Sequence, residues 1–294
     1  MKSVNEAQNI VMVTGKGGVG KSAIAAAIAQ KHAHSGQNTL LVELGDQSYF
    51  THIYHRKIDY HPVEIFKNFS VALWNGESCL REYVRYLIKF EKVADLFFDN
   101  RVMHTLIRAA PALKELAILG KITSGIRKWG PSLNYDVIVV DGFASGNFMA
   151  LLRAPIGMGE LIKSGPMGEQ SRNIIGVLKN PEQCKFVLVS LLEELSVTET
   201  IELKNDISKL LGQSSNVYCN RYYDCGLSIS ELESAASEAS ALDNQQFAND
   251  LKSKMGRQNA QHKILDDDSG VEKKVNLIFS ADGVEIINAA EANL

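Results

Sequence analysis

The stretch Gly15-Lys16-Gly17-Gly18-Val19-Gly20-Lys21-Ser22 contains the residue types that are needed to hold a phosphate group. It fits the template of a glycine, four residues and then Gly-Lys-Ser. The glycines let the backbone approach a phosphate closely, and successive backbone N–H groups then surround the β-phosphate. Lys21 would reach the β- and γ-phosphates, and the Ser22 hydroxyl would bind Mg²⁺. The spacing therefore predicts a nucleotide-binding loop.

The residues on either side of this loop predict a strand before it and a helix after it. An apolar run at 10–13 precedes the first glycine, and an alanine-rich run at 23–29 follows the serine. The helix should extend from Lys21 to about His34, where a Ser-Gly pair supplies a stop signal. Its N-terminus would add partial positive charge to the phosphate site.

Acidic residues follow two further predicted strands. The apolar runs at 39–43 and 135–141 predict buried strands, and they lead to Asp46 and Asp141 respectively. Ligands of doubly wound sheets bind beyond the carboxyl ends of the strands. Asp141 is therefore expected to hold Ser22 or a magnesium-bound water. Asp46 is placed to meet Mg²⁺ or to activate the attacking water, and Glu43 is a second possibility for that role.

Lys16, directly after the first glycine, is not required by the general template. This lysine marks a deviant phosphate loop, and the stretch resembles that of the ATPases that include ArsA, the tail-anchored-protein targeting ATPase, MinD, ParA and the nitrogenase iron protein. In that family the lysine reaches across a dimer interface to the partner's nucleotide. The resemblance implies ATP or ADP with Mg²⁺, ATP hydrolysis in which Lys16 and Lys21 take part, and a homodimer or a heterodimer with a paralogue.

Other segments are similar to the ArsA-like members of that family. The segment 142–147 resembles their second switch, in which Gly146 would sense the γ-phosphate through its backbone. An asparagine at the end of a late strand reads the adenine in the family, and Asn220 ends the predicted strand 217–221. The family's proposed water activator is an aspartate after the second strand. A gap-free register places Gly45 there and Asp46 one position later, so Glu43 stays an alternative.

The segment 49–68 contains His52, His55 and His61. Histidines three residues apart can share a helix face, and imidazole suits zinc. The segment is nevertheless rich in Tyr, Lys and Arg and lacks strand or helix signals. We therefore expect a mobile, switch-like loop after the second strand and not a metal site.

The rest of the chain alternates predicted strands with helical patterns. A short strand is expected at 69–74, a helical subdomain at about 78–130, a strand at 185–191, a helix start near Ser196 or Thr198 with Glu199, a helical stretch at 227–262, a flexible loop at 266–270 and a last strand at 275–279. This alternation predicts an α/β fold: a doubly wound, mostly parallel sheet flanked by helices, of the P-loop NTPase type. We expect a single domain over 1–294 that contains the helical subdomain.

The composition limits the compartment and the partners. The chain has 294 residues, 45% of them hydrophobic, and a formal net charge of −3, which gives no reason to expect a nucleic-acid surface. An apolar run of about 18 residues, which would predict a membrane span, is missing, as is a signal-peptide core. The four cysteines form no Cys-x-x-Cys pair. We expect a cytoplasmic protein with no integral membrane segment.

Three functions remain open. The first is a dimeric, ATP-hydrolysing protein of the ArsA-like class whose nucleotide state switches a helical surface that binds a protein partner. The second is a positioning ATPase similar to ParA or MinD, which would need a membrane-binding helix or a basic DNA-binding surface. The third is an ATP-dependent metabolic enzyme of the same superfamily, which would need a compact pocket for a second substrate. The cysteine spacing disfavours a metal-delivery ATPase.

Overall fold

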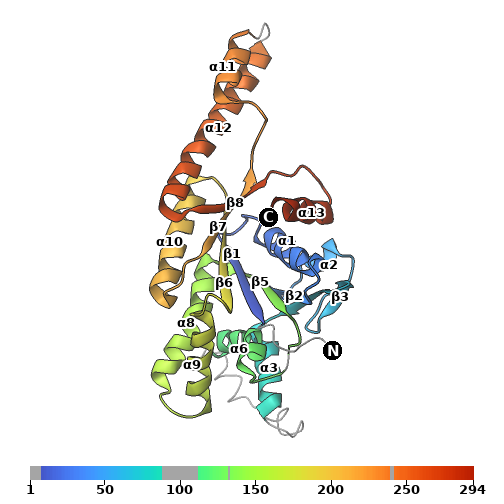
Figure 1. The fold of residues 1–294 in the computed structure, drawn as a ribbon, viewed down its shortest axis with the longest axis vertical. Helices are drawn as coiled ribbons and strands as arrows, with labels where there is room; N and C mark the ends of the chain where they lie inside the picture. Colours follow the sequence, from blue (N-terminus) through green and yellow to red (C-terminus); the bar gives the residue numbers. More distant parts are fainter. Residues whose placement is uncertain (1–7, 88–111, 132, 239–241) are drawn as a thin grey trace.

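The computed structural model describes residues 8–87, 112–131, 133–238 and 242–294. Within them, one sheet has the strand order β3-β4-β2-β5-β1-β6-β7-β8 (Figure 1). The strands are β1 (Asn9–Gly15), β2 (Thr39–Leu44), β3 (Val63–Phe66), β4 (Phe69–Trp74), β5 (Val137–Ala144), β6 (Cys184–Ser190), β7 (Asn216–Tyr222) and β8 (Val271–Asn276). Only the β3–β4 pair is antiparallel among these described strands. The expected mostly parallel sheet is confirmed.

Helices cover both faces of the sheet, which explains why its central strands are apolar along almost their whole length. One face carries α1 (Lys21–His34), α2 (Phe50–Ile53) and α13 (Gly283–Asn293). The other carries α3 (Gly76–Leu87), α6 (Ala112–Ile122), α7 (Ser124–Arg127), α8 (Ser145–Leu161), α9 (Pro166–Leu178) and α10 (Glu194–Leu211). Successive residues of β2 point to opposite faces, so Leu40 and Val42 join one core cluster while Leu41 joins the other.

A helical hairpin extends from the body of the molecule (Figure 1). It consists of α11 (Ile229–Glu238) and α12 (Leu242–Ser269), and it connects β7 to β8. Lys252 and Glu233 join its two helices through an ion pair of 2.6 Å. Gln258 joins α12 to the carboxyl end of β7, since its amide accepts from the Tyr223 backbone N–H at 2.8 Å and donates to the Tyr223 carbonyl at 2.9 Å.

The structure confirms the first helix from Lys21 to His34 and the short strand at 69–74. The helices α3, α6 and α7 lie within the segment expected to form a helical subdomain, of which residues 88–111 lie outside the described residues.

Several boundaries expected from the sequence are wrong. The segment 49–68 contains α2 and β3, because Phe50 joins the buried core cluster that includes α1 residues and β3 pairs with β4, and only 54–62 between them is irregular. Helix α10 begins at Glu194, two residues before Ser196. The expected flexible loop at 266–270 belongs mostly to α12, which ends where Gly270 takes a φ of 65°. The last strand begins at Val271 and ends at Asn276, because its pairing with β7 fixes its position.

Candidate functional site

The predicted phosphate loop connects β1 to α1 at the carboxyl edge of the sheet. Gly18 and Gly20 have φ values of 82° and 89°, in the left-handed region that other residues rarely adopt. A Cβ atom at Gly17 or Gly18 would meet nothing within 4 Å, so the inner side of the loop faces open space. A Cβ atom at Gly15 would instead meet the Val189 carbonyl oxygen of β6, so close backbone packing requires glycine there.

Lys21 begins α1 and its ammonium turns back over the loop. Nζ donates to the Lys16 carbonyl oxygen at 3.0 Å. Burial lowers the pKa of Lys21, while the nearby carboxylates of Asp141 and Glu199 raise it. The positive charge therefore lies between the loop and two acidic groups, where a phosphate would compete for it.

Asp141 lies within β5, between β1 and β2. Its direct neighbours across the sheet are Val13 of β1 and Glu43 of β2. The side chain is buried, and burial raises its pKa to about 7; a hydrogen bond with Ser22 lowers the value and the charge on Glu43 raises it. Its Oδ1 atom has no hydrogen-bond partner in the described part of the chain.

This arrangement fits Mg²⁺. A buried carboxylate oxygen without a partner lies beside a serine hydroxyl, and both are hard oxygen donors of the kind that Mg²⁺ prefers. Ser22 and Asp141, the two residues expected to hold the ion, are thus brought together across the sheet edge.

The two candidates for water activation differ in their surroundings. Glu43 is buried, and burial raises its pKa. Its carboxylate accepts from the Ser48 hydroxyl at 2.6 Å and from the Tyr49 backbone N–H at 2.7 Å, so it fixes the turn after β2. Asp46 lies exposed on that turn, where Oδ1 accepts from the Asn75 amide at 3.1 Å. The structure thus places Glu43 beside Asp141 and leaves Asp46 at the surface.

Lys16 lies next to Glu199, which the sequence predicts only as part of a helix start. Its Nζ lies 3.8 Å from Oε2 of Glu199 on α10. Oε1 of the same carboxylate accepts from the hydroxyl of Ser145, the first residue of α8. Gly146, the predicted γ-phosphate sensor, comes next and is exposed at this helix start. A spacing rule could not find Glu199, because the contact spans 183 positions (199 − 16).

Asn220 closes the other side of the phosphate loop. Its Nδ2 donates to the Val19 carbonyl oxygen at 2.8 Å, and its Oδ1 accepts from the Arg221 backbone N–H at 2.9 Å. A Cβ atom at Gly20 would collide with this amide. Val19 itself is buried and anchors the loop to the core.

A cavity of about 540 Å³ extends from this point. One end is lined by Gly18, Gly20, Lys21, Ser22 and Ala23, and the remainder by Tyr49, Asn220, Arg221, Asn276, Leu277, Ile278, Ser280, Ile286 and Ala290. The side that the sequence assigned to adenine is therefore formed by the end of β7, the segment after β8 and α13. Of the described residues that line the cavity, none is Lys16 or Asp46.

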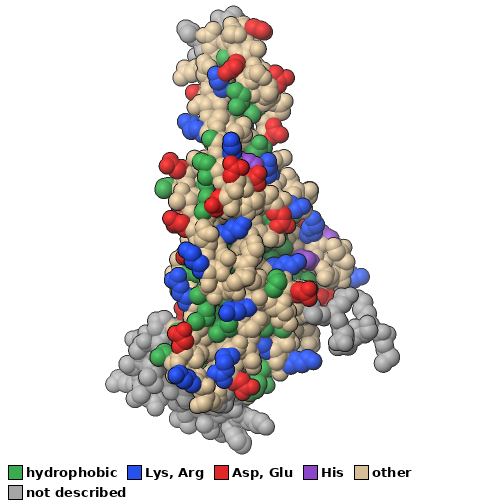
Figure 2. All heavy atoms as spheres, turned by 60° about the vertical axis from the view of Figure 1, so that its left-hand side comes forward, with side chains coloured by type: hydrophobic (Ala, Val, Ile, Leu, Met, Phe, Trp, Pro, Cys, Tyr) green, Lys and Arg blue, Asp and Glu red, His purple; other side chains and the backbone are tan. Residues whose placement is uncertain are grey.

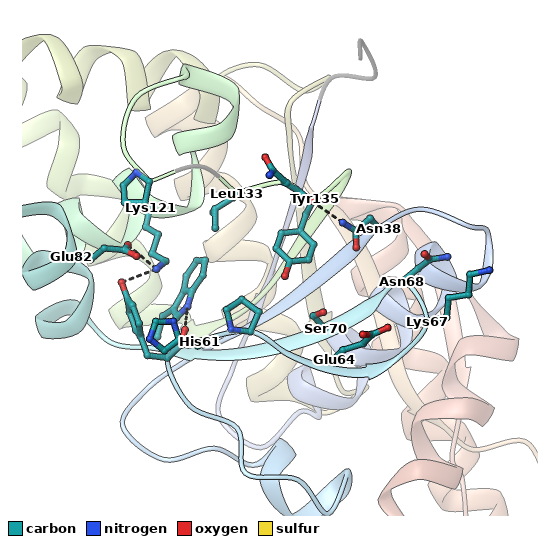
Figure 3. A pocket seen from close by; sticks show the side chains of 15 residues that line it. Asn38, His61, Glu64, Lys67, Asn68, Ser70, Glu82, Lys121, Leu133 and Tyr135 are labelled. Atoms are coloured by element: carbon teal, nitrogen blue, oxygen red, sulfur yellow. Dashed lines mark hydrogen bonds and ion pairs between the residues drawn. The ribbon is translucent and has the colours of Figure 1, made fainter. Parts of the chain in front are cut away.

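A second cavity, of about 740 Å³, lies between the outer strands and helices α3 and α6 (Figure 3). Lys121 is only 7% exposed at one end of it. Its Nζ donates to Glu82 at 2.8 Å and to the Tyr60 hydroxyl at 2.7 Å, and lies 4.5 Å from the centre of the Trp74 ring. This cluster keeps a buried cation satisfied by one carboxylate and two aromatic groups.

The opposite end of this second cavity is lined by Asn38, Asn68 and Tyr135 (Figure 3). These residues lie just before β2, β4 and β5, at the amino ends of parallel strands. The phosphate loop follows the carboxyl end of β1 and lines the first cavity, whereas none of residues 15–22, all of which the structure describes, lines the second.

Other features limit the kinds of site. No group of three or more His, Cys, Asp or Glu side chains is placed to hold a metal ion among the described residues. No described helix has the length and apolar character to cross a membrane. Figure 2 shows basic and acidic side chains interspersed over one face of the molecule.

A mostly parallel sheet, a glycine-rich loop between β1 and α1, and the Ser22–Asp141 pair at the sheet edge define a P-loop NTPase. Comparison with known proteins agrees: the family model for anion-transporting ATPases matches residues 8–165. The chain belongs to this ArsA-like ATPase family and is an ATPase.

Individual relatives are distant. ATPase BagA of Mycobacterium tuberculosis is 28% identical over 237 residues, which cover 76% of this chain and 68% of the relative. An arsenical pump-driving ATPase of Escherichia coli is 24% identical over 71% of this chain and 39% of the relative. An ATPase ASNA1 homolog of Plasmodium falciparum is 23% identical over 85% of this chain and 73% of the relative.

Proposed function

We propose that the chain works as a dimeric ATPase in which each phosphate loop supplies Lys16 to the nucleotide of the partner. The observation that carries this proposal is the position of Lys16. Its ammonium lies beside Glu199, about one-third exposed, while Lys21 faces the cavity of its own subunit. Lys16 does not line the cavity of its own subunit, so its side chain is available to a site on a facing subunit.

The nucleotide would lie in the cavity of about 540 Å³, with its phosphates against the backbone of the loop. Lys21 and the N-terminus of α1 would bind the β- and γ-phosphates. Ser22 and Asp141 would hold Mg²⁺, which supplies charge stabilisation at the transferring phosphoryl group. In this arrangement Asp141 gains a partner for its Oδ1 atom, which relieves the cost of its burial.

Water activation remains assigned to Asp46, with Glu43 as the alternative. Asp46 would have to move from its contact with Asn75 towards the cavity. Glu43 is already next to Asp141, but the Ser48 hydroxyl and the Tyr49 N–H occupy its oxygens. Movement of the turn after β2 would serve either residue, because Glu43 fixes that turn and Asp46 lies on it.

We further propose that the helices on the α3, α6 and α9 face form the surface that responds to nucleotide state and binds a protein partner. A small groove of about 30 Å³, lined mostly by apolar residues such as Leu80, Leu113, Leu116 and Met167 with Tyr83 and Gln170, lies between these helices and supports this. Residue Ser145 connects the end of β5, which carries Asp141, to α8, and α8 packs against both α6 and α9. A shift of β5 on ligand binding would therefore move α8, and through α8 the helices that line the groove.

The test measures ATP turnover per chain over a range of protein concentrations, together with sedimentation velocity in ADP and in a non-hydrolysable ATP analogue. We expect turnover per chain to rise with concentration until the dimer is saturated. Lys16→Ala should remove this activity, while Lys57→Ala, at a lysine that is 87% exposed, should not. Turnover that is independent of concentration in a chain that sediments as a monomer would contradict the dimeric mechanism.

A further inference from the structure

An irregularity interrupts β7 where it reaches the nucleotide cavity. Cys219 pairs with Lys274 of β8, and the next pair is Tyr222 with Asn276. The chain thus advances three residues along β7 against two along β8, which is one extra residue and defines a β-bulge. Within it Arg221 has a φ of 54°, in the left-handed region. Bulges next to functional sites re-aim a side chain, and a residue with a Cβ atom adopts this backbone conformation only at a cost in free energy.

The bulge is connected to the phosphate loop. The backbone N–H of Arg221 donates to Oδ1 of Asn220, and Nδ2 of the same amide donates to the Val19 carbonyl of the loop. Asn220 is only 8% exposed, so this link is shielded from water. The unusual backbone of Arg221 is therefore held in a fixed position relative to the loop.

The side chain of Arg221 is not used for packing. The residue is exposed, and within the described part of the chain its guanidinium has no hydrogen-bond or ion-pair partner. Arg221 nevertheless lines the cavity of about 540 Å³. A strained, well-anchored backbone that presents an unpaired cation at the wall of a cavity needs an explanation other than fold stability.

The chemistry of the cavity indicates what this cation meets. The phosphate loop forms one end, and the other end carries the apolar side chains Leu277, Ile278, Ile286 and Ala290. Arg221 lies on the strand that pairs with β8, next to this apolar end and not on the loop. An apolar wall suits the flat face of a nucleotide base, and a planar guanidinium stacks on aromatic faces.

We propose that Arg221 stacks on the base of the bound nucleotide and holds it against the apolar wall formed by Ile278, Ile286 and Ala290. This rests on the proposed nucleotide site, to which it adds a base-contacting residue. Arg221 contacts the face of the base, so it contributes affinity for any nucleotide base. Groups that contact the edge of the base determine which base is preferred. The bulge is what turns the Arg221 side chain to that position.

The experiment is calorimetric titration of the full chain with ATP and, separately, with inorganic tripolyphosphate, both with Mg²⁺. The informative variant is Arg221→Gly, because glycine accepts the left-handed backbone and removes only the side chain. We expect it to bind ATP roughly 5- to 100-fold more weakly, the range for loss of one stacking group on a base. Its affinity for tripolyphosphate should be unchanged. Arg153→Ala, at an exposed arginine of α8, is the matched control and should change neither affinity.

The other outcomes separate the alternatives. Equal losses for ATP and tripolyphosphate would place the guanidinium on the phosphates and overturn the base contact, as would unchanged binding of both. Failure of the unaltered protein to bind either ligand would instead refute the nucleotide site itself. If Arg221→Gly does not fold, Arg221→Lys keeps the charge without the planar group. It should then show the same selective loss for ATP to a smaller extent, and full ATP affinity in that variant would overturn the stacking proposal.

Discussion

The ammonium of Lys16 lies 3.8 Å from the carboxylate of Glu199 in the same chain. Both side chains are about one-third exposed, so the pair is partly screened by solvent and contributes little to stability. Glu199 also accepts from Ser145 at the start of α8. Lys16 is thus held at a position from which a stronger anion could withdraw it at small cost.

Lys16→Ala should leave ATP binding largely intact and reduce hydrolysis strongly. The backbone of the loop and Lys21 still hold the phosphates, whereas a finger-type cation contributes about 10³–10⁵ in rate where it has been measured. Turnover and ATP affinity should be measured on the same preparation. An equal loss of binding and hydrolysis would mean that Lys16 serves its own subunit.

Mixing Lys16→Ala with Asp46→Ala protein sharpens this test. If Asp46 acts within its own subunit and Lys16 across the interface, a mixed dimer carries both defects in one site and none in the other. A pure mixed dimer should then have about half the activity of the unaltered dimer, and an equimolar mixture after random exchange, in which half of the dimers are mixed, should recover about a quarter. The same mixture with Glu43→Gln in place of Asp46→Ala decides between the two candidate bases. No recovery with either partner, under conditions of proven subunit exchange, would refute the in-trans role.

Asp141→Asn should stabilise the nucleotide-free, magnesium-free protein at pH 8, and should stabilise it clearly less, though still measurably, at pH 5. Burial raises the pKa of Asp141 to about 7 from an ordinary value of about 3.9. A raised carboxyl pKa favours the folded state at low pH, and this contribution is lost as the pH rises towards 7. At about 1.4 kcal/mol per pH unit, the gain at pH 8 is about 4 kcal/mol at most.

The measurement for Asp141→Asn is thermal unfolding at both pH values, with Asp267→Asn on the exposed part of α12 as the control. The same variant should lose the dependence of ATP binding on Mg²⁺. Equal shifts in Tm at pH 5 and pH 8 would show that burial does not raise the pKa of the Asp141 carboxyl group.

Asn220→Ala should weaken ATP binding and reduce the preference for adenine over guanine. One amide N–H is engaged by Val19, which leaves the second N–H and one lone pair of Oδ1 for a base edge. Loss of such a pair costs roughly 1–3 kcal/mol by analogy with base readout in nucleic acids. Competition between ATP and GTP measures it, and an unchanged preference would assign base reading to another residue.

Glu82→Gln should destabilise the fold, because it leaves the buried Lys121 ammonium with neutral partners. The loss should be about 1–3 kcal/mol, below the 3–5 kcal/mol of a fully buried pair, since Glu82 is 30% exposed. Urea unfolding measures this difference. Glu77→Gln, at an exposed pair with Arg81 in the same helix, should cost less than about 0.5 kcal/mol. Equal effects for both variants would show that the Lys121 cluster is well hydrated.

The sequence by itself determined the class of protein and the elements on either side of the phosphate loop. The loop motif, the apolar runs around it and the boundaries of α1 depend on residues close together in the chain, where spacing and periodicity fix the geometry. The strand that carries Asp141 was predicted for the same reason, because a strand buried on both faces has a continuous apolar run.

Only the tertiary structure decided how distant residues meet. The pairing of β2 with β5 places Glu43 beside Asp141, the position of α10 gives Lys16 its neighbour Glu199, and the link from Asn220 to Val19 spans 201 positions. The bulge at Arg221 depends on pairing with β8, a strand whose alternating charged residues obscured its start. These contacts are set by the order of strands in the sheet, and no local pattern in the chain encodes that order.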